Sequence, residues 1–274
     1  MFPHVARDNH VKTRVDSMKD IYVVTLAHAR ADERGGSSGG QPGDQTANKE
    51  HTRGELLFQD WYVSGSGWDC CMRAKPEKIR KQMAEDACRA VRNTKIGYSQ
   101  GNRYSLYDAA KPHGFDCGKV DKPVDCDCSL LMTVCANYAG LLIPKDTRTA
   151  NMQIRYTATK EFKVYTSNKY TKQPDYLKVG DILVRAGHHT AIVANTLYHM
   201  TRQLKLTEGE RMRGKDVRAL QQRLNELTGA ALETDGVFGP ATDDILVVFQ
   251  LNNGLDPDGI MGKHTAEAMG FLWD

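Results

Sequence analysis

The sequence lacks any apolar run that approaches the roughly 20 residues of a membrane-spanning helix, so we expect no insertion into a membrane. Its first residues, 1–8, also lack the apolar centre of a secretory signal, which predicts a protein held in a cytoplasm. Hydrophobic residues make up 40% of the 274 positions and charged residues 26%, as is typical of globular proteins. A chain of this length can form one large domain or two modest ones.

Cysteine occurs seven times, and this odd number excludes a fully paired disulfide framework. We therefore expect mostly reduced thiols. A zinc site can be drawn from Cys117, Cys126 and Cys128 with His113 nearby, but the two-residue spacing of paired zinc ligands is missing. The sequence predicts no metal ion and no organic cofactor.

The first 116 residues lack a phosphate-binding loop. Residues 35–44 are rich in glycine, but they lack the Lys-Ser/Thr of a P-loop and follow a stretch, 15–30, with the apolar spacing of a helix. We interpret 35–44 as a surface loop, with a mobile wall of a cleft as the alternative. A second helix is predicted over 76–93, where Pro76 stands near the first turn and apolar residues recur at four-residue steps.

The segment Asp127-Cys128-Ser129 opens a run with apolar residues at helical spacing, which ends at Gly140. A cysteine in the first turn of a helix lies beside unpaired backbone N–H groups and the helix dipole, and both favour a thiolate. The same N–H groups can receive a developing oxyanion. Cys128 is therefore the candidate nucleophile, whereas Cys135 has the position of a small apolar packing residue.

Two adjacent histidines follow, at the start of an alternating, β-branched run that predicts a strand; residues 181–184 predict the strand before it. Alternation places His188 and His189 on opposite faces. A histidine near a thiol can act as its general base, and a third polar group commonly orients such an imidazole. Asn195 shares the face of His189 by parity, and His199 is the alternative.

Asp-Cys-Ser at a helix start, then 179–183, then His-Thr-Ala-Ile-Val, resembles the NlpC-type and CHAP-type papain-like peptidases that cut bacterial cell walls. The resemblance covers about 117–200. It implies that Cys128 is the nucleophile, that His189 is the base, and that His188 faces solvent. It also implies that Asp127 and Ser129 hold the peptide stem of the substrate, although Asp127 is equally suited to cap the helix.

The last seventy residues contain a repeat: Asp-Gly-Val-Phe-Gly at 235–239 recurs as Asp-Gly-Ile-Met-Gly at 258–262. Each copy predicts a turn followed by a helix, with Thr242 or Thr265 as the N-cap. Apolar residues between 217 and 227 predict a helix before the first copy. This three-helix pattern resembles the peptidoglycan-binding domain found on many wall hydrolases, from about Arg202 to Met269.

Charge divides unevenly along the chain. Residues 1–203 carry 30 Lys and Arg against 22 Asp and Glu, a net of +8, while 204–274 carry 7 against 12, a net of −5. A basic first part is attracted to an anionic polymer. Its basic residues are scattered and not interleaved with aromatic ones, so we expect no nucleic acid as partner and favour an anionic cell wall.

Together these features predict an α+β, papain-like catalytic domain at 1–202, followed by a small all-α three-helix bundle at 203–274. The expected activity is hydrolysis of an amide bond in the peptide stem of bacterial peptidoglycan, through a thioester on Cys128. The alternatives are an N-acetylmuramoyl-L-alanine amidase of the same fold and a non-catalytic wall-binding or virion structural protein. The resemblance to phage endolysins implies a monomer that accumulates in the host cytoplasm and acts on the wall after release.

Overall fold

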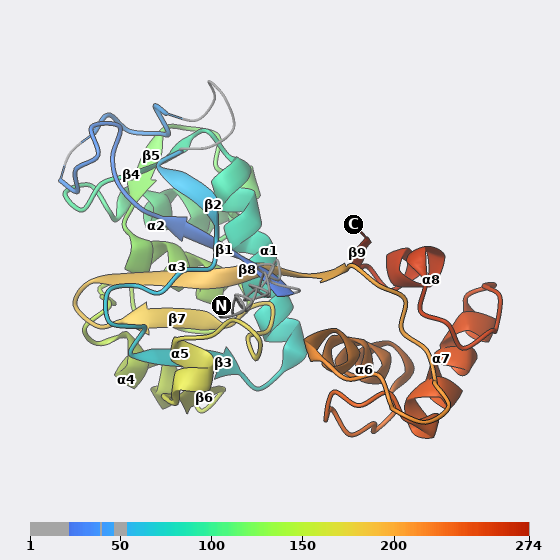
Figure 1. Cartoon of the computed structure of the whole chain (residues 1–274). Helices are drawn as coiled ribbons and strands as arrows, with labels where there is room; N and C mark the ends of the chain where they lie inside the picture. Colours follow the sequence, from blue (N-terminus) through green and yellow to red (C-terminus); the bar gives the residue numbers. More distant parts are fainter. Residues whose placement is uncertain (1–21, 39, 47–53, 274) are drawn as a thin grey trace, which may run out of the picture. The chain divides into compact units, whose positions relative to one another are not determined.

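The computed structural model describes residues 22–38, 40–46 and 54–273. Within these ranges the chain forms two compact units, which divide between Tyr198 and His199. The first unit combines a sheet with helices, and the second is mainly helical (Figure 1). The predicted α+β class is therefore confirmed. Among the described helices, none has the length and apolar character needed to cross a membrane.

The first unit is built around one antiparallel sheet. Its elements in chain order are β1 (Tyr22–Ala29), β2 (Leu56–Asp60), β3 (Cys70–Ala74), α1 (Glu77–Arg92), β4 (Ile96–Tyr98), α2 (Ser105–Ala110), η1 (Lys111–His113), η2 (Cys117–Lys119), β5 (Val124–Cys126), α3 (Cys128–Tyr138), α4 (Met152–Ala158), β6 (Phe162–Tyr165), α5 (Asn168–Thr171), β7 (Ile182–Arg185) and β8 (His189–Met200). The strand order in the sheet is β2-β1-β8-β7-β3-β6, and β4 pairs in parallel with β5 alongside it.

Both faces of this sheet are covered. On one face α1 and α3 pack against each other and against side chains of β1, β3 and β7, including Ala27, Met72 and Ile182. On the other face a smaller apolar cluster gathers around Trp68 and Val193. Burying apolar surface on both sides fixes the central strands β1 and β8, and these strands carry the histidines described below.

The predicted helix over 15–30 is wrong in its described part, because Tyr22–Ala29 is strand β1. Residues 15–21 of that prediction lie outside the described residues. Apolar residues such as Tyr22 and Leu26 lie four positions apart, which suggested a helix. Four is also an even number, so this spacing matches the two-residue period of a strand equally well. β1 lies between β2 and β8 with both faces covered, and such central strands read as nearly continuous apolar runs.

Other predicted elements are confirmed. The helix over 76–93 is α1, the helix that opens at Cys128 is α3, and the two strands near 181–184 and from His189 are β7 and β8. The described part of the glycine-rich loop is tied to the β4–β5 pair: the N–H of Gln100 donates to the carbonyl of Ser37 at 2.8 Å, and the N–H of Gly43 donates to Val124 at 3.1 Å. These bonds match its interpretation as a surface loop.

The second unit contains the three predicted helices. These are α6 (Lys215–Thr228), α7 (Pro240–Asn252) and α8 (Lys263–Ala268), followed by β9 (Leu272–Trp273), which pairs with the last two residues of β8. The predicted threonine caps are wrong, because α7 and α8 begin at Pro240 and Lys263, with Gly239 and Gly262 at the N-cap positions. The two threonines lie inside the helices and are buried.

Instead of capping, each threonine accepts a hydrogen bond from a buried glutamine. The amide nitrogen of Gln221 donates to Asp235, Val237 and Thr242 at 2.9, 3.0 and 3.3 Å. The amide nitrogen of Gln250 donates to Asp258, Ile260 and Thr265 at 2.9, 3.0 and 3.2 Å. The repeat in the sequence is thus a repeat of one bonding pattern, and its aspartates and threonines have structural roles.

Candidate active site

Helix α3 begins at Cys128 because Asp127 caps it. The carboxylate of Asp127 accepts a hydrogen bond from the N–H of Leu130 at 2.7 Å, and its backbone is extended, as expected of an N-cap residue. The predicted capping role of Asp127 is therefore confirmed. Cys128 is the first helical residue, so its side chain lies beside N–H groups that have no partner within the helix.

The structure brings Cys128 close to the start of β8. The backbone N–H groups of Thr190, the residue that follows His189, and of Ser129 act on its thiol and favour the thiolate. Only 6% of the Cys128 surface is exposed. The predicted nucleophile thus lies near the residue that follows the predicted base.

A second histidine, which the sequence did not suggest, pairs with the predicted base. Nδ1 of His28 on β1 lies 2.7 Å from Nε2 of His189, and the two rings meet edge to face with their centroids 5.0 Å apart. β1 and β8 are antiparallel neighbours, and this pairing carries His28 to the ring of His189. His28 thus contacts Nε2 of His189 and does not engage Nδ1 of that ring.

The two residues suggested as the third, orienting group lie elsewhere. Asn195 is six positions beyond His189 on β8, which is about 20 Å along a strand. Asn195 is exposed, and the structure does not bring it to the imidazole. His199 belongs to the second unit, and the structure does not describe its side chain. His188 is exposed, as expected for the neighbour that faces solvent.

Aromatic side chains enclose the histidine pair. The ring of Trp68 lies 6.1 Å from that of His189, and the ring of Tyr62 lies 6.2 Å from that of His28. The indole N–H of Trp68 donates to the carbonyl of Tyr62 at 3.0 Å, which fixes these two rings relative to each other. His28 is fully buried beneath these rings, whereas His189 keeps partial access to solvent. The sequence showed only the presence of aromatic residues around 61–68.

Burial sets the protonation of the site. It lowers the pKa of His189 to about 4, with a further contribution from the charge of Arg30, and it lowers the pKa of His28 to about 3, assisted by His189 and Arg30. Burial also raises the pKa of the Cys128 thiol to about 12, together with the charge of Asp127. At neutral pH the thiol and both imidazoles are therefore uncharged, and His189 is ready to accept a proton.

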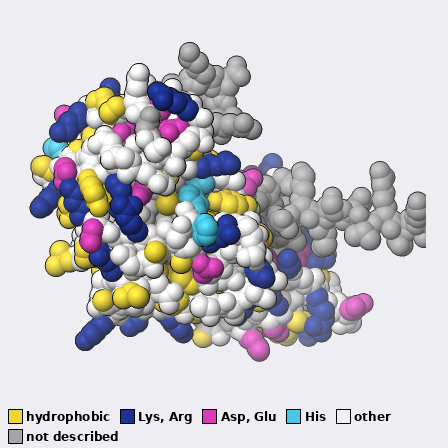
Figure 2. Space-filling model, turned by 90° about the vertical axis from the view of Figure 1, so that its left-hand side faces the viewer, with side chains coloured by type: hydrophobic (Ala, Val, Ile, Leu, Met, Phe, Trp, Pro, Cys, Tyr) yellow, Lys and Arg dark blue, Asp and Glu magenta, His cyan; other side chains and the backbone are white. Residues whose placement is uncertain are grey.

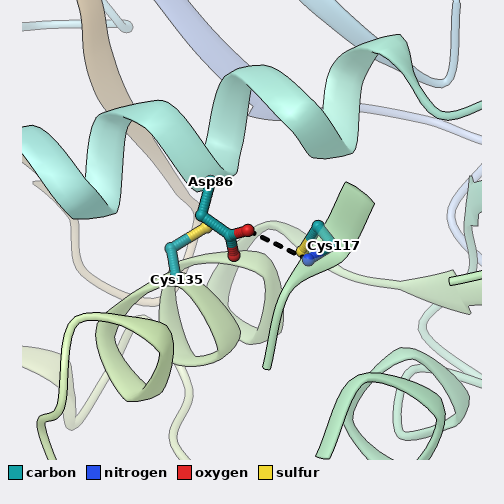
Figure 3. Close-up of side chains that lie close together, drawn as sticks. All are labelled: Asp86, Cys117 and Cys135. Atoms are coloured by element: carbon teal, nitrogen blue, oxygen red, sulfur yellow. Dashed lines mark hydrogen bonds between the residues drawn. The ribbon is translucent and has the colours of Figure 1, made fainter. Parts of the chain in front are cut away.

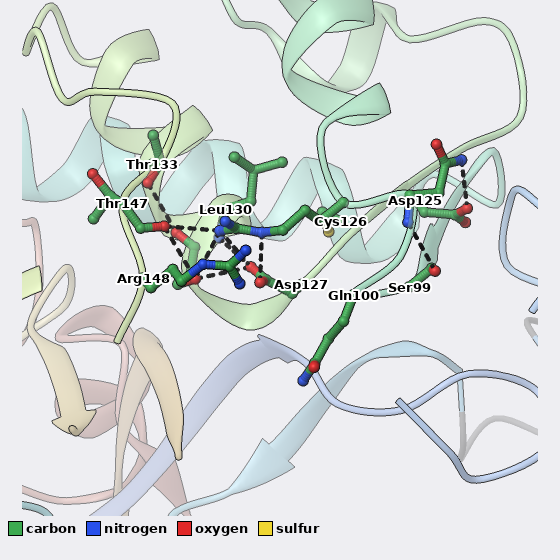
Figure 4. Close-up of polar contacts among 12 residues, drawn as sticks. Ser99, Gln100, Asp125, Cys126, Asp127, Leu130, Thr133, Thr147 and Arg148 are labelled. Carbon is green, nitrogen blue, oxygen red and sulfur yellow. Dashed lines mark hydrogen bonds and ion pairs between the residues drawn. The ribbon is translucent and has the colours of Figure 1, made fainter. Parts of the chain in front are cut away.

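Arg103 anchors the start of α3, and its side chain is 1% exposed. Figure 4 shows Asp127, Leu130 and Thr147 close together there. The guanidinium of Arg103 forms an ion pair with Asp127, with Nε and Nη2 at 2.6 and 3.0 Å from the two carboxylate oxygens. The same Nη2 donates to Oγ of Ser129 at 3.0 Å and to the carbonyl of Thr147 at 2.8 Å. Breaking such a buried pair from one side costs several kcal/mol, so Arg103 holds the first turn of the helix firmly.

This network bears on the predicted substrate contacts. Asp127 and Ser129 are 5% and 2% exposed, and both are already engaged by Arg103. Either side chain would have to exchange a partner in order to hold a peptide stem. That role stays a prediction, whereas their part in positioning Cys128 follows from the contacts.

Replacing His28 tests whether it orients His189. We expect His28→Leu to lower turnover roughly 10-fold or more, a share of the 10²–10⁴ that a positioned base contributes. His28→Asn should retain much of the activity, because an amide can still hydrogen-bond to Nε2 of His189. Steady-state assays on both variants measure this. Equal loss in the two variants would show that His28 acts only by filling space.

We also expect replacement of His28 to change how the stability of the chain depends on pH. The unfolded chain protonates His28 near pH 6.5, but the folded chain does so only near pH 3, so stability is lost as the pH falls between these values. The slope is at most about 1.4 kcal/mol per pH unit. In denaturant titrations, the free energy of unfolding of His28→Asn should depend less on pH over this range than that of the wild-type chain. An unchanged slope would contradict the buried, neutral state of His28.

Two family models match this chain. The model described as "Endolysin-like domain" matches residues 26–197, which is more than half of the chain and includes both histidines and Cys128. The model described as "Putative peptidoglycan binding domain" matches residues 213–269, which contain α6, α7 and α8.

One curated relative is an N-acetylmuramoyl-L-alanine amidase, CwlM, of Mycobacterium tuberculosis. It is 38% identical over 79 residues, which are 29% of this chain and 18% of the relative. The similarity thus spans less than a fifth of that protein. No solved structure matches the chain significantly.

Proposed function

Because the chain belongs to the family of endolysin-like domains, we propose that it is a peptidoglycan hydrolase with a papain-like cysteine mechanism. The observation that carries the mechanism is the arrangement at the end of the sheet. Cys128 at the first turn of α3 contacts the N–H of Thr190, and the adjacent His189 is paired with His28. This is the set of groups that thiol-based acyl transfer needs: a nucleophile, a base and a group that orients the base.

The reaction follows from these positions. Nδ1 of His189 takes the proton of the Cys128 thiol as the sulfur attacks the carbonyl carbon of a stem amide. Backbone N–H groups at the start of α3 stabilise the negative oxygen that develops. The protonated imidazole then gives its proton to the leaving amine, and a thioester remains on Cys128. Water, deprotonated by His189, attacks the thioester, which releases the carboxylate and restores the thiol.

The Cys128 thiol and the His189 imidazole are both neutral before substrate binds, and this decides when the proton moves. With a thiol pKa of about 12 and an imidazole pKa of about 4, no thiolate is formed before substrate binds. The proton therefore moves during the attack and not before it. A neutral imidazole down to about pH 4 means that the base remains competent in mildly acidic solution.

The second unit fits a role in binding peptidoglycan. Its three helices match the peptidoglycan-binding model, and its sequence carries a net charge of −5 over 204–274. An acidic surface does not attract an anionic wall, so the binding would depend on shape and hydrogen bonds. Figure 2 shows basic side chains among side chains of other types on the face in view.

Digestion of purified cell walls tests the function. The full chain should release soluble fragments, and mass spectrometry of the new amine and carboxyl ends identifies the bond. Pretreatment with iodoacetamide should stop the release once Cys128 has reacted, because alkylation removes the nucleophile. The reaction should be slow, since the thiol is buried and protonated. Walls that remain intact under reducing conditions, with the chain bound to them, would instead support the non-catalytic wall-binding protein.

An amidase that cuts between the glycan and the first stem residue is the second candidate. The matching relative is named as such an enzyme, although the match covers only a small part of it. Both reactions break an amide bond, and the groups around Cys128 serve either of them. The two are told apart by the fragments: a stem endopeptidase leaves part of the peptide on the glycan, and the amidase leaves none.

Separating the two units tests the division of labour. A fragment of 199–274 should pellet with purified walls, release no fragments and stay bound at high salt, since its binding would not depend on charge. A fragment of 1–198 should cut soluble stem peptides but clear intact walls several-fold more slowly, because it loses local concentration at the polymer. Co-sedimentation at low and high salt measures the first effect. A second-unit fragment that stays in solution at both would contradict the binding role.

A further inference from the structure

Three side chains with metal-binding atoms meet in the interior of the first unit, away from the candidate active site (Figure 3). Asp86 comes from the middle of α1, Cys117 from the start of η2, and Cys135 from α3. All three are 0% exposed. The close-up shows the carboxylate and the two sulfur atoms pointing toward one another across the space between α1 and α3.

Their spacing suits a single ion. The ligand atoms of the three residues all lie within 4.8 Å of one another. Zinc binds cysteine sulfur at about 2.3 Å and carboxylate oxygen at about 2.0–2.2 Å in a tetrahedral arrangement, so neighbouring ligand atoms on one ion lie about 3.6–3.8 Å apart. Rotamer adjustments that close the present spacing by up to about 1 Å would therefore place all three on one zinc ion. Two thiolates are the donors that select zinc over magnesium or calcium.

The Asp86 carboxylate is only partly satisfied by N–H donors. Oδ1 accepts the backbone N–H of Cys117 at 2.9 Å and pairs with Nη2 of Arg89 at 3.1 Å. Oδ2 is buried, and no N–H or O–H group of the described residues donates to it, so the weak thiol donors of Cys117 and Cys135 are what face this carboxylate. A buried carboxylate oxygen that faces only weak donors is costly, and a bound ion would satisfy it. Bound through both oxygens, the carboxylate would give zinc four donor atoms together with the two sulfurs.

One cation lies beside these three acidic groups. The guanidinium of Arg89 contacts Asp86 at 3.1 Å, and it also contacts Asp116 at 3.1 Å and Glu85 at 3.8 Å. A divalent ion would therefore add positive charge where two thiolates and a carboxylate meet.

We propose that Asp86, Cys117 and Cys135 form a structural zinc site. On binding, each thiol gives up its proton to solvent, two Zn–S bonds form, and the carboxylate supplies the oxygen donors; nothing is oxidised or reduced. The site ties α1, η2 and α3 together. Cys135 is seven residues after Cys128 on the same helix, about 10 Å along its axis, so the ion steadies the catalytic helix from a distance and takes no part in the reaction.

Metal content and thermal stability of the full chain test the site without any assay of activity. Purified chain should contain about one zinc per molecule. Chelation should lower the Tm and added zinc should restore it, because an ion that binds the folded state alone stabilises that state. Cobalt in place of zinc should give the absorption of sulfur-to-metal charge transfer. Cys117→Ser and Cys135→Ser should lose the metal and the zinc-dependent rise in Tm, while Cys70→Ser, buried in β3, should keep both.

Three results would overturn the proposal. Wild-type chain that binds no zinc, shows no cobalt–sulfur absorption and has seven titratable thiols when unfolded would leave a plain cluster of hydrogen-bonded thiols. Five thiols and a mass lower by two hydrogens would show a Cys117–Cys135 disulfide instead. Zinc that stays bound in both serine variants would place the metal elsewhere. The cobalt spectrum of the wild-type chain decides even if the serine variants fold poorly.

Discussion

The Cys128→Ser variant should fold normally and release no wall fragments, with turnover below roughly one hundredth of that of the wild-type chain. A serine hydroxyl is far harder to deprotonate than a thiol and is a weaker nucleophile, so the same imidazole activates it much less effectively. The side chain keeps its size closely enough to leave the contacts of α3 in place. Turbidity loss of purified walls and a far-UV spectrum of each protein measure activity and folding.

Cys88→Ser is the matched control, since Cys88 is a partly buried cysteine on α1 outside the candidate site. It should keep nearly full activity. The wild-type chain should lose its activity when one cysteine, Cys128, is alkylated. The Cys128→Ser variant has no thiol to alkylate at this position. Substantial lysis by Cys128→Ser would remove this residue from the mechanism, whatever the wall-binding behaviour of the chain.

His189→Ala should lower turnover by a factor of roughly 10² or more, because it removes both the base and the acid that protonates the leaving amine. His188→Ala should have a small effect, because that side chain is exposed. The pair is a close control, since both residues are histidines one position apart. Stopped assays over a pH range, with kcat and KM measured separately, distinguish loss of the base from loss of substrate affinity.

A larger effect of His188→Ala than of His189→Ala would mean that the face assignment is inverted, since one position along a strand changes the face. A similar loss in both variants would point to damage at the start of β8 and not to a specific base. If His188→Ala has the larger effect, the contact between His28 and His189 would be purely structural. The result would then disagree with the test made on the His28 variants.

The sequence predicted the local features of the site well. The position of α3 and its start at Cys128 follow from apolar spacing and a capping aspartate, and the strands β7 and β8 follow from alternation. Such signals lie within a dozen neighbouring residues. The helix α1 was readable for the same reason, with a proline before its first turn.

The sequence did not predict which distant residues contact those local features. His28 and His189 are 161 positions apart, and only the pairing of β1 with β8 brings them together. That pairing was hidden because the apolar spacing in β1 suits a helix as well as a strand. The role of Arg103 was not predicted for a related reason. Nothing in the sequence around a single arginine in a polar stretch indicates that it will be buried against Asp127.

The cysteines show the limit of proximity in sequence. Cys117, Cys126 and Cys128 are close along the chain, yet Cys117 lies with Cys135 and Asp86. Cys126, at the end of β5, places its sulfur 3.7 Å from the carbonyl of Gly97. The turn between β5 and α3 sends adjacent residues to different surroundings, so spacing along the chain does not tell which thiols lie together.

The two glutamine-centred bonding patterns of the second unit close segments of different length. Gln221 and Asp235 are 14 positions apart, whereas Gln250 and Asp258 are 8 apart, yet both contacts measure 2.9 Å. Closing a longer loop costs little extra free energy, and the bond geometry is set at the glutamine and not by the residues between. Within these stretches, residues 229–234 and 253–257 lie outside the helices. A change in the length of these loops can therefore leave the glutamine-centred bonds and the helices as they are.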